Sequence, residues 1–220
     1  MKLFIDLETI KSSREDLKEY VVKKLKPPAT MKKQETIDNW WLDKAPFVVD
    51  EKIDKTSLDG NYGEVISISY ALNNNPVKNL FRFPDTPESD LLEAFYRDLI
   101  DELGMRKITK WVGHNIAGFD LPFLFKRFVI NNVPIPSDMP INPKSWDRSV
   151  FDTSAEWACH GNRISQDELC FIFGFDGKPD DITGANVGQH YIDGNFEKII
   201  EYNNYDVETV RKLFNKMNQL

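Results

Sequence analysis

Residues 2–9 read Lys-Leu-Phe-Ile-Asp-Leu-Glu-Thr, an apolar run that reaches two carboxylates within one short stretch. The β-forming side chains predict a strand over residues 2–7. Because successive side chains of a strand point to opposite faces, Asp6 and Glu8 share one face and Leu7 points to the other. Two carboxylates on one face can bridge a pair of metal ions. The same triplet also fits a solvated strand end, so by itself it does not distinguish a metal site from a surface strand. The other acidic residues of the chain are needed for that distinction.

A second acidic residue follows a strand further along the chain. Residues 113–120 read Gly-His-Asn-Ile-Ala-Gly-Phe-Asp, and they join a predicted strand at 110–113 to a predicted helix at 119–131. Asp120 stands at the start of that helix, where the helix dipole favours an acid. Helix capping is therefore one interpretation of Asp120, and a place in an acidic site is the other. Asn115 offers an amide near the strand end, where it could hydrogen-bond a nucleotide or a loop.

The third acidic site lies in the last predicted helix, at 196–218. Residues 202–206 read Tyr-Asn-Asn-Tyr-Asp. Positions i and i+4 share a helix face, so Tyr202 and Asp206 can reach one site together. A surface pair on the helix is the alternative. Tyr205 points about 100° away from Asp206 around the helix, and we expect it to pack instead.

Four carboxylates that meet in one pocket need compensation. Like charges at close range raise one another's pKa values and cannot all stay ionised. Divalent metal is the usual compensation, and oxygen ligands select Mg²⁺ or Mn²⁺ over zinc. We therefore expect such ions at Asp6, Glu8, Asp120 and Asp206.

The rest of the chain predicts an α/β fold. Further strands are expected at 64–72, 77–83 and 150–153, and further helices at 12–26, 34–43, 87–103, 165–173 and 185–192. Residues 44–62 show no clear periodicity and predict a polar loop. This order predicts one domain over residues 1–220, built on a mixed five-stranded sheet flanked by helices. A basic and aromatic helical insertion, residues 11–62, interrupts it after the first strand.

Bulk composition limits the classes of protein that fit. The chain has 220 residues and a formal net charge of −7, which by itself argues against nucleic acid. Residues 11–33, however, hold eight basic and three acidic side chains, which gives a local charge of +5. No run of 18 apolar residues is present, so no membrane span is expected. Two cysteines in a chain of this size fit a reducing cytoplasm.

The acidic and tyrosine motifs together resemble the DEDD superfamily of 3′–5′ exonucleases, in the branch whose third motif is Tyr-x-x-x-Asp. The sister branch has a histidine five residues before the last aspartate, where this chain has Glu201. The chain is most similar to the proofreading exonuclease domain of family B DNA polymerases and to stand-alone bacterial and phage proteins built from it. The stretches that carry the similarity are 5–9, 113–127 and 180–214.

This resemblance implies a ribonuclease H-like fold and release of nucleoside monophosphates from a 3′ end. Two metal ions ~4 Å apart would clamp the scissile phosphate. Asp6 would bridge both ions, Glu8 and Asp206 would complete one metal site, and Asp120 would hold the other ion mostly through water. Tyr202 would orient the attacking water.

Substrate contacts are expected from two groups of residues. Neighbours of the catalytic residues form the first group: Leu7, Thr9, Asn115 and Phe119. The second group is basic or aromatic: Lys32, Lys33, Trp40 and Lys178. In the insertion, lysines beside tryptophan suit a single strand, because they hold its backbone and stack its bases. The alternative is that the tryptophans close a small satellite core and the lysines form a solvated helix face.

The function expected is metal-dependent 3′–5′ hydrolysis of single-stranded DNA or frayed ends, with replication or repair proteins as possible partners. A second reading keeps the chemistry and makes RNA the substrate, as in ribonuclease D-like relatives. A third is a non-catalytic module that binds nucleic acid or the replisome. The presence of all four carboxylates favours the two catalytic readings.

Overall fold

The computed structural model describes residues 1–144, 147–159, 161–178 and 181–219. The chain divides into two compact units. The first, here called the sheet-centred unit, combines Met1–Thr9 with Val65–Leu220, and the second, here called the insert, is Ile10–Glu64. No helix in the described ranges combines the length and the apolar character needed to cross a bilayer.

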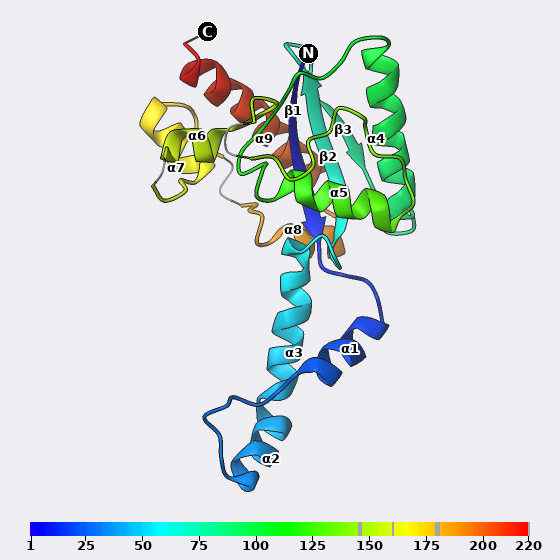
Figure 1. Cartoon of the computed structure of the whole chain (residues 1–220), viewed down its shortest axis with the longest axis vertical. Coiled ribbons are helices and arrows are strands. Elements are labelled where there is room, and N and C mark those ends of the chain that lie inside the picture. Colours follow the sequence, from blue (N-terminus) through cyan, green and yellow to red (C-terminus); the bar gives the residue numbers. More distant parts are fainter. Residues whose placement is uncertain (145–146, 160, 179–180, 220) are drawn as a thin grey trace. The chain divides into compact units, whose positions relative to one another are not determined.

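A five-stranded sheet forms the centre of the first unit (Figure 1). Its strands in spatial order are β3 (Lys78–Phe81), β2 (Glu64–Leu72), β1 (Lys2–Ile10), β4 (Lys110–Gly113) and β5 (Val150–Asp152). β4 runs parallel to both β1 and β5, whereas β2 and β3 are antiparallel. The predicted mixed sheet of five strands is therefore confirmed. Gly113 pairs with Asp152, which puts the carboxyl ends of β4 and β5 side by side.

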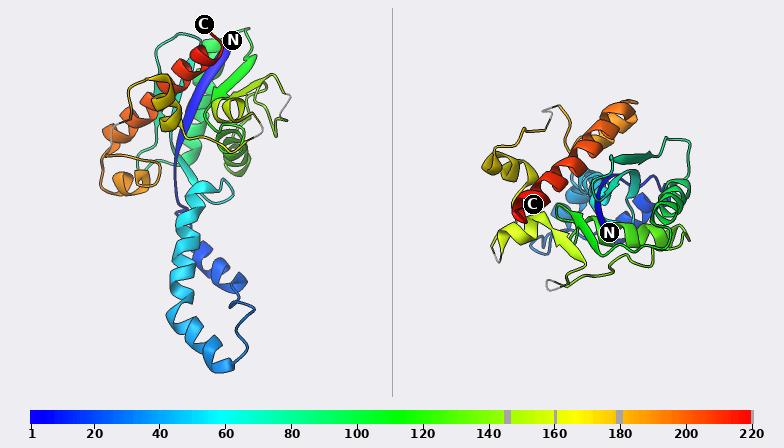
Figure 2. Two further views of the ribbon diagram at one scale, coloured as in Figure 1. Left: turned by 90° about the vertical axis from the view of Figure 1, so that its left-hand side faces the viewer. Right: turned by 90° about the horizontal axis from the view of Figure 1, so that it is seen from above.

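Helices cover both faces of this sheet. α4 (Glu88–Leu103) and α5 (Asp120–Ile130) lie on one face, and α9 (Phe196–Met217) lies on the other (Figure 2). Shorter helices complete the unit: α6 (Thr153–Ala158), α7 (Gln166–Phe173) and α8 (Val187–Ile192). The sequence did not predict α6, which is only six residues long.

Alternation along β1 sorts its side chains between the two faces. Leu3, Ile5 and Leu7 are buried in the core that α4 and α5 share. Phe4 packs on the opposite side in a second cluster, which includes residues of α9 such as Val207. Asp6 and Glu8 have the parity of Phe4, so they point toward the α9 side of the sheet.

The insert is helical throughout most of its length. It contains α1 (Asp16–Lys24), α2 (Gln34–Asp43), α3 (Ala45–Asp54) and the short 3₁₀ helix η1 (Lys55–Leu58). The prediction of a polar loop over residues 44–62 was wrong for α3 and η1. α3 buries only Ala45 and Val49, so the apolar periodicity that marks a helix is too weak to recognise there.

Candidate functional site

Three carboxylates from the two ends of the chain meet on the α9 side of the sheet. Asp6 and Glu8 come from β1 and Asp206 comes from α9, and one oxygen of each lies within 4.8 Å of the others. Glu8 and Asp206 are 6% and 4% exposed, while Asp6 is half-buried. Strand alternation places the first two side chains, and packing of α9 against the sheet brings in the third.

Asp120 lies beside this group without joining its closest set of oxygens. It is the first residue of α5 and is 3% exposed. Burial raises the pKa of Asp120 to about 7, although backbone N–H groups, including that of Leu7, stabilise its charged form. Asp120 in turn contributes to raising the pKa of Asp6 and of Glu8, which shows that the four carboxyl groups share one electrostatic environment.

The pKa values of Asp6, Glu8 and Asp206 are all raised. Burial, followed by repulsion from Asp206, raises the pKa of Asp6 and of Glu8 well above their ordinary values. Burial also raises the pKa of Asp206, although Lys178 and Gln166 favour its charged form. Without further cations, these groups cannot all be ionised near neutral pH.

The ammonium group of Lys178 reaches the cluster from the loop before α8. Lys178 Nζ lies 2.6 Å from Asp206 Oδ1 and 3.2 Å from Tyr202 Oη. Burial by itself lowers the pKa of Lys178, but Asp206 and Tyr202 together raise it above its ordinary value. The sequence-based prediction that Lys178 contacts the substrate stays a prediction, since the contacts observed are with protein groups.

Tyr202 lies one helical turn before Asp206, as the i, i+4 spacing requires. Its side chain is buried, with 7% exposed. Burial and the charge of Asp206 raise the pKa of the phenol above its ordinary value, although Lys178 opposes the shift. The hydroxyl therefore keeps its proton at neutral pH and can act as a hydrogen-bond donor.

Two amide side chains that the sequence analysis missed hold the carboxylates in place. Asn203 Nδ2 donates to Asp6 Oδ2 at 2.7 Å, and Gln166 Nε2 donates to Asp206 Oδ1 at 2.9 Å. Asn203 is fully buried and Gln166 nearly so. Neither pairing has a short-range signal, because 197 and 40 residues separate the partners along the chain.

Asp152 organises the loop between β4 and α5. Its carboxylate accepts hydrogen bonds from the backbone N–H of Asn115 at 2.8 Å and of Ala117 at 3.3 Å. Asn115 has φ 59°, a left-handed conformation that Asn tolerates better than most residues. A carboxylate at the end of the strand beside β4 was the available signal for Asp152, and the sequence analysis did not use it.

One atom of this loop is left without a partner. Asn115 Oδ1 is buried and accepts no hydrogen bond from the residues that the structure describes. Buried acceptors are rarely left unsatisfied in native proteins. That Asn115 contacts the substrate stays a prediction.

The remaining predicted substrate contacts are more scattered. Leu7 packs in the core, so only its backbone is available to a ligand, and Thr9 is half-buried. Phe119 packs against the same core, with its ring centroid 5.4 Å from that of Phe123. The predicted contacts within the insert separate into two kinds: exposed Lys32 and Lys33, and buried Trp40.

The donor set fits hard divalent cations. It consists of carboxylate oxygens, with no sulfur or imidazole nitrogen in the close group of three. Oxygen-only ligands are typical of Mg²⁺ and Mn²⁺ sites. One lysine balances only part of the negative charge that the carboxylates carry when ionised.

Comparisons with known proteins agree with this geometry. A family model described as a predicted 3′–5′ exonuclease related to the exonuclease domain of PolB matches residues 57–220. No protein with curated annotation matches the sequence. Among solved structures, the family B DNA polymerase of the hyperthermophilic archaeon Pyrobaculum calidifontis is similar, with a TM-score of 0.62 and 16% identity. The similarity covers 98% of this chain and 24% of the polymerase, so the chain spans about a quarter of that protein. The expected ribonuclease H-like fold is thereby confirmed.

Proposed function

Because the chain belongs to the family of predicted 3′–5′ exonucleases related to the exonuclease domain of PolB, we propose that it hydrolyses single-stranded DNA or frayed ends from the 3′ terminus. The products would be nucleoside monophosphates, and the reaction would depend on two divalent metal ions. The observation that carries the proposal is the convergence of Asp6, Glu8 and Asp206 within 4.8 Å, with buried Asp120 beside them.

The carboxylates are the groups that would hold the metal ions. Asp6, Glu8 and Asp206 form the close set, and Asp120 is near enough to influence the pKa of Asp6. When bound, divalent ions supply Lewis-acid stabilisation of charge on the phosphate and lower the pKa of water. Asn203 and Gln166 support this role because each fixes the orientation of one carboxylate.

The hydrogen-bonding groups of Tyr202 and Asn115 determine the roles proposed for these two residues. A phenol whose pKa is raised is a poor general base, so Tyr202 orients the attacking water as a hydrogen-bond donor or acceptor. In the hydrolysis, water oxygen bonds to phosphorus and the bond from phosphorus to the 3′ oxygen of the preceding nucleotide breaks. Asn115, in the loop after β4, is the proposed contact for the sugar or base of the departing nucleotide.

Digestion of a 5′-labelled oligonucleotide tests the proposal. In Mg²⁺ or Mn²⁺, single-stranded DNA should yield a ladder that shortens by one nucleotide at a time from the 3′ end, and EDTA should abolish it. The same experiment with RNA of matched sequence separates deoxyribonuclease from ribonuclease activity. Binding of the oligonucleotide without any cleavage would reject the proposal in favour of a non-catalytic binding module.

A further inference from the structure

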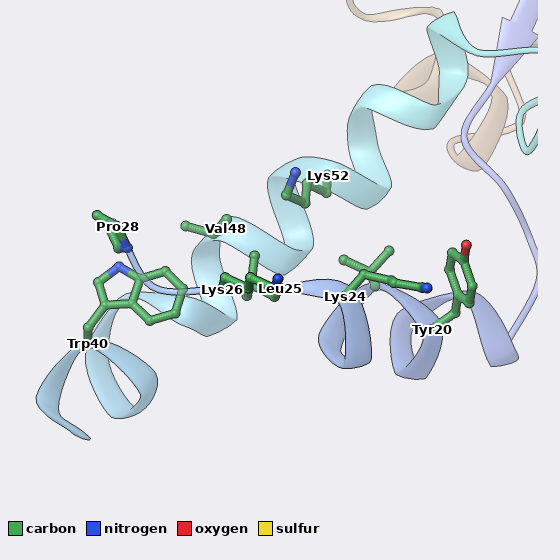
Figure 3. A pocket seen from close by; sticks show the side chains of 9 residues that line it. Tyr20, Lys24, Leu25, Lys26, Pro28, Trp40, Val48 and Lys52 are labelled. Atoms are coloured by element: carbon green, nitrogen blue, oxygen red, sulfur yellow. The ribbon is translucent and has the colours of Figure 1, made fainter. Parts of the chain in front are cut away.

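The insert has an open cavity of its own (Figure 3). Its volume is about 510 Å³, within the range of pockets that bind small organic ligands. The lining side chains come from α1, the turn that follows it, α2 and α3. Six of them are aliphatic or aromatic: Tyr20, Val21, Leu25, Pro28, Trp40 and Val48. In Figure 3, Trp40 and Tyr20 stand toward opposite ends of the cavity.

The charged side chains of this cavity have one sign. Lys24, Lys26 and Lys52 line it, and no aspartate or glutamate does. Within the described ranges, Lys26 and Lys52 have no carboxylate within ion-pair distance, and the Lys24 ammonium lies 5.8 Å from the centre of the Tyr20 ring.

Four other lysines of the insert are paired with carboxylates, whereas Lys32, Lys33 and Lys44, which do not line the cavity, are not paired with any carboxylate that the structure describes. These four pairs lie outside the cavity, namely Lys18 with Asp50, Lys23 with Glu19, Lys11 with Asp54, and Lys55 with Glu51. The lining of the cavity thus carries three ammonium groups and no carboxylate. An occupant that complements this charge is anionic.

We infer that the cavity binds one or two nucleotides of single-stranded DNA, an inference that rests on the function proposed above. An apolar wall with two aromatic rings suits a base, and three ammonium groups suit the phosphates on either side of it. Aromatic surface beside lysines is the usual combination in proteins that bind single strands without sequence preference. Trp40 is 8% exposed and packs edge-on against Trp41 with ring centroids 5.1 Å apart, so its ring is held in place.

According to this inference, the residues of the insert that contact the strand are those that line the cavity. Lys32 and Lys33 carry charge in the same segment but do not line the cavity. Trp40 both packs in the insert and lines the cavity, so the two interpretations offered by the sequence, satellite core and base contact, are compatible. A second contact on the same chain raises the local concentration of the strand at the carboxylate site, because the insert is joined covalently to β1 and β2.

Binding by the full-length protein in EDTA tests the inference without hydrolysis. Fluorescence anisotropy with a labelled single strand of thymidylates compares the wild type, Lys26→Glu/Lys52→Glu, and the control Lys18→Glu/Lys44→Glu. Both double variants change the net charge equally, and all four lysines are exposed. We expect the cavity variant to raise Kd by at least ~10-fold and to lower the salt slope by roughly 1.4, as expected for two lost phosphate contacts. The control should stay within ~2-fold of the wild type.

Two further probes separate base contact from charge alone. Tyr20→Ala should weaken binding about fivefold, the effect of losing one weak stacking contact. A labelled abasic strand of equal length should bind the wild type more weakly than the thymidylate strand does. Equal effects of the two double variants, or equal binding of the abasic strand, would overturn the inference.

Hydrolysis measured in parallel keeps the two proposals apart. If wild-type protein fails to cleave the strand in Mg²⁺, the proposed function fails, whereas the binding comparison in EDTA still decides the role of the cavity. If cleavage proceeds and the cavity variant binds as tightly as the control, the cavity inference fails and the nuclease proposal stands.

Discussion

The sheet-centred unit and the insert differ in where their charged side chains lie. The first unit buries carboxylates at Glu8, Asp120 and Asp206, and it also buries an ion pair between Glu88 and Arg127. Every lysine of the insert is exposed, and its one buried carboxylate is Glu64, where the insert meets β2. Buried charge is costly and persists where packing and hydrogen bonds hold it, whereas exposed charge is inexpensive and adaptable. This contrast agrees with the two proposals above, in which the sheet-centred unit carries the chemistry and the insert binds the strand.

The largest expected effect is the loss of a carboxylate from the cluster. Asp6→Ala or Asp206→Ala should lower the hydrolysis rate by at least ~10³-fold, because either change would remove several kcal/mol of charge stabilisation. Each 1.36 kcal/mol corresponds to a factor of about ten in rate. Cleavage of a 5′-labelled strand gives the rate. Lys18→Glu/Lys44→Glu in the insert is the control and should cleave at nearly the wild-type rate. Equal activity in Asp6→Ala would end the assignment of the site.

Ion pairs in the two units should differ in their effect on stability. Arg127 and Glu88 are 8% and 5% exposed, and Glu88 also accepts the backbone N–H of Val65. Arg127→Ala should therefore lower the free energy of unfolding by about 3–5 kcal/mol, since it leaves a buried carboxylate unpaired.

The matched change in the insert is Lys23→Ala, which breaks an exposed pair with Glu19. Its effect on the urea midpoint should fall within experimental error. Unfolding in urea, followed by circular dichroism, measures both variants. Similar midpoints for Arg127→Ala and Lys23→Ala would contradict the contrast drawn here.

A smaller effect is expected at Tyr202. Tyr202→Phe removes the hydroxyl that lies 3.2 Å from Lys178 Nζ and leaves the carboxylates untouched. The maximal rate should fall roughly 10- to 100-fold, the scale on which positioned hydrogen-bonding groups contribute, while the affinity for Mn²⁺ changes little. Single-turnover kinetics measures the change in rate, and calorimetric titration measures the affinity for Mn²⁺. A lost metal affinity would indicate a structural role for the phenol instead.

The smallest effect concerns pH and is confined to the sheet-centred unit. Asp120 has its pKa raised by burial to about 7 in the folded protein. A group whose pKa is raised on folding stabilises the protein below its unfolded pKa, and this stabilisation is lost as pH rises through the folded value. In EDTA, the Tm of the wild type should therefore fall between pH 5 and pH 8.

Asp120→Asn is the matched variant for this measurement, because it keeps the shape and removes the titration. The Tm of Asp120→Asn should fall less than that of the wild type over the same pH range. Each kcal/mol by which the stabilities of the two proteins differ should change the difference in Tm by roughly 2–4 °C. Parallel curves for the two proteins would show that Asp120 is not the group responsible.

Local geometry made the catalytic candidates predictable from sequence. The period of two in a strand placed Asp6 and Glu8 on one face, and the i, i+4 spacing placed Tyr202 beside Asp206. The strands and the long amphipathic helices were also predictable, because each buries a broad apolar face. β1 nevertheless extends to Ile10, beyond its predicted end at residue 7.

Contacts between distant parts of the chain could not be predicted. Asn203 meets Asp6 and Gln166 meets Asp206 only because α9 and α7 are folded onto the sheet. Short elements with little buried surface were missed for a different reason. α3 and α6 lack the apolar stripe that identifies a helix, and α6 begins at a cap supplied by Asp152.

Anomalous scattering from crystals soaked in Mn²⁺ tests the central claim most directly. The account predicts Mn²⁺ peaks within coordination distance of Asp6, Glu8 and Asp206 in the wild type, and no peaks there in Asp6→Ala. Wild-type crystals without Mn²⁺ at these carboxylates, at concentrations that support cleavage, would contradict it.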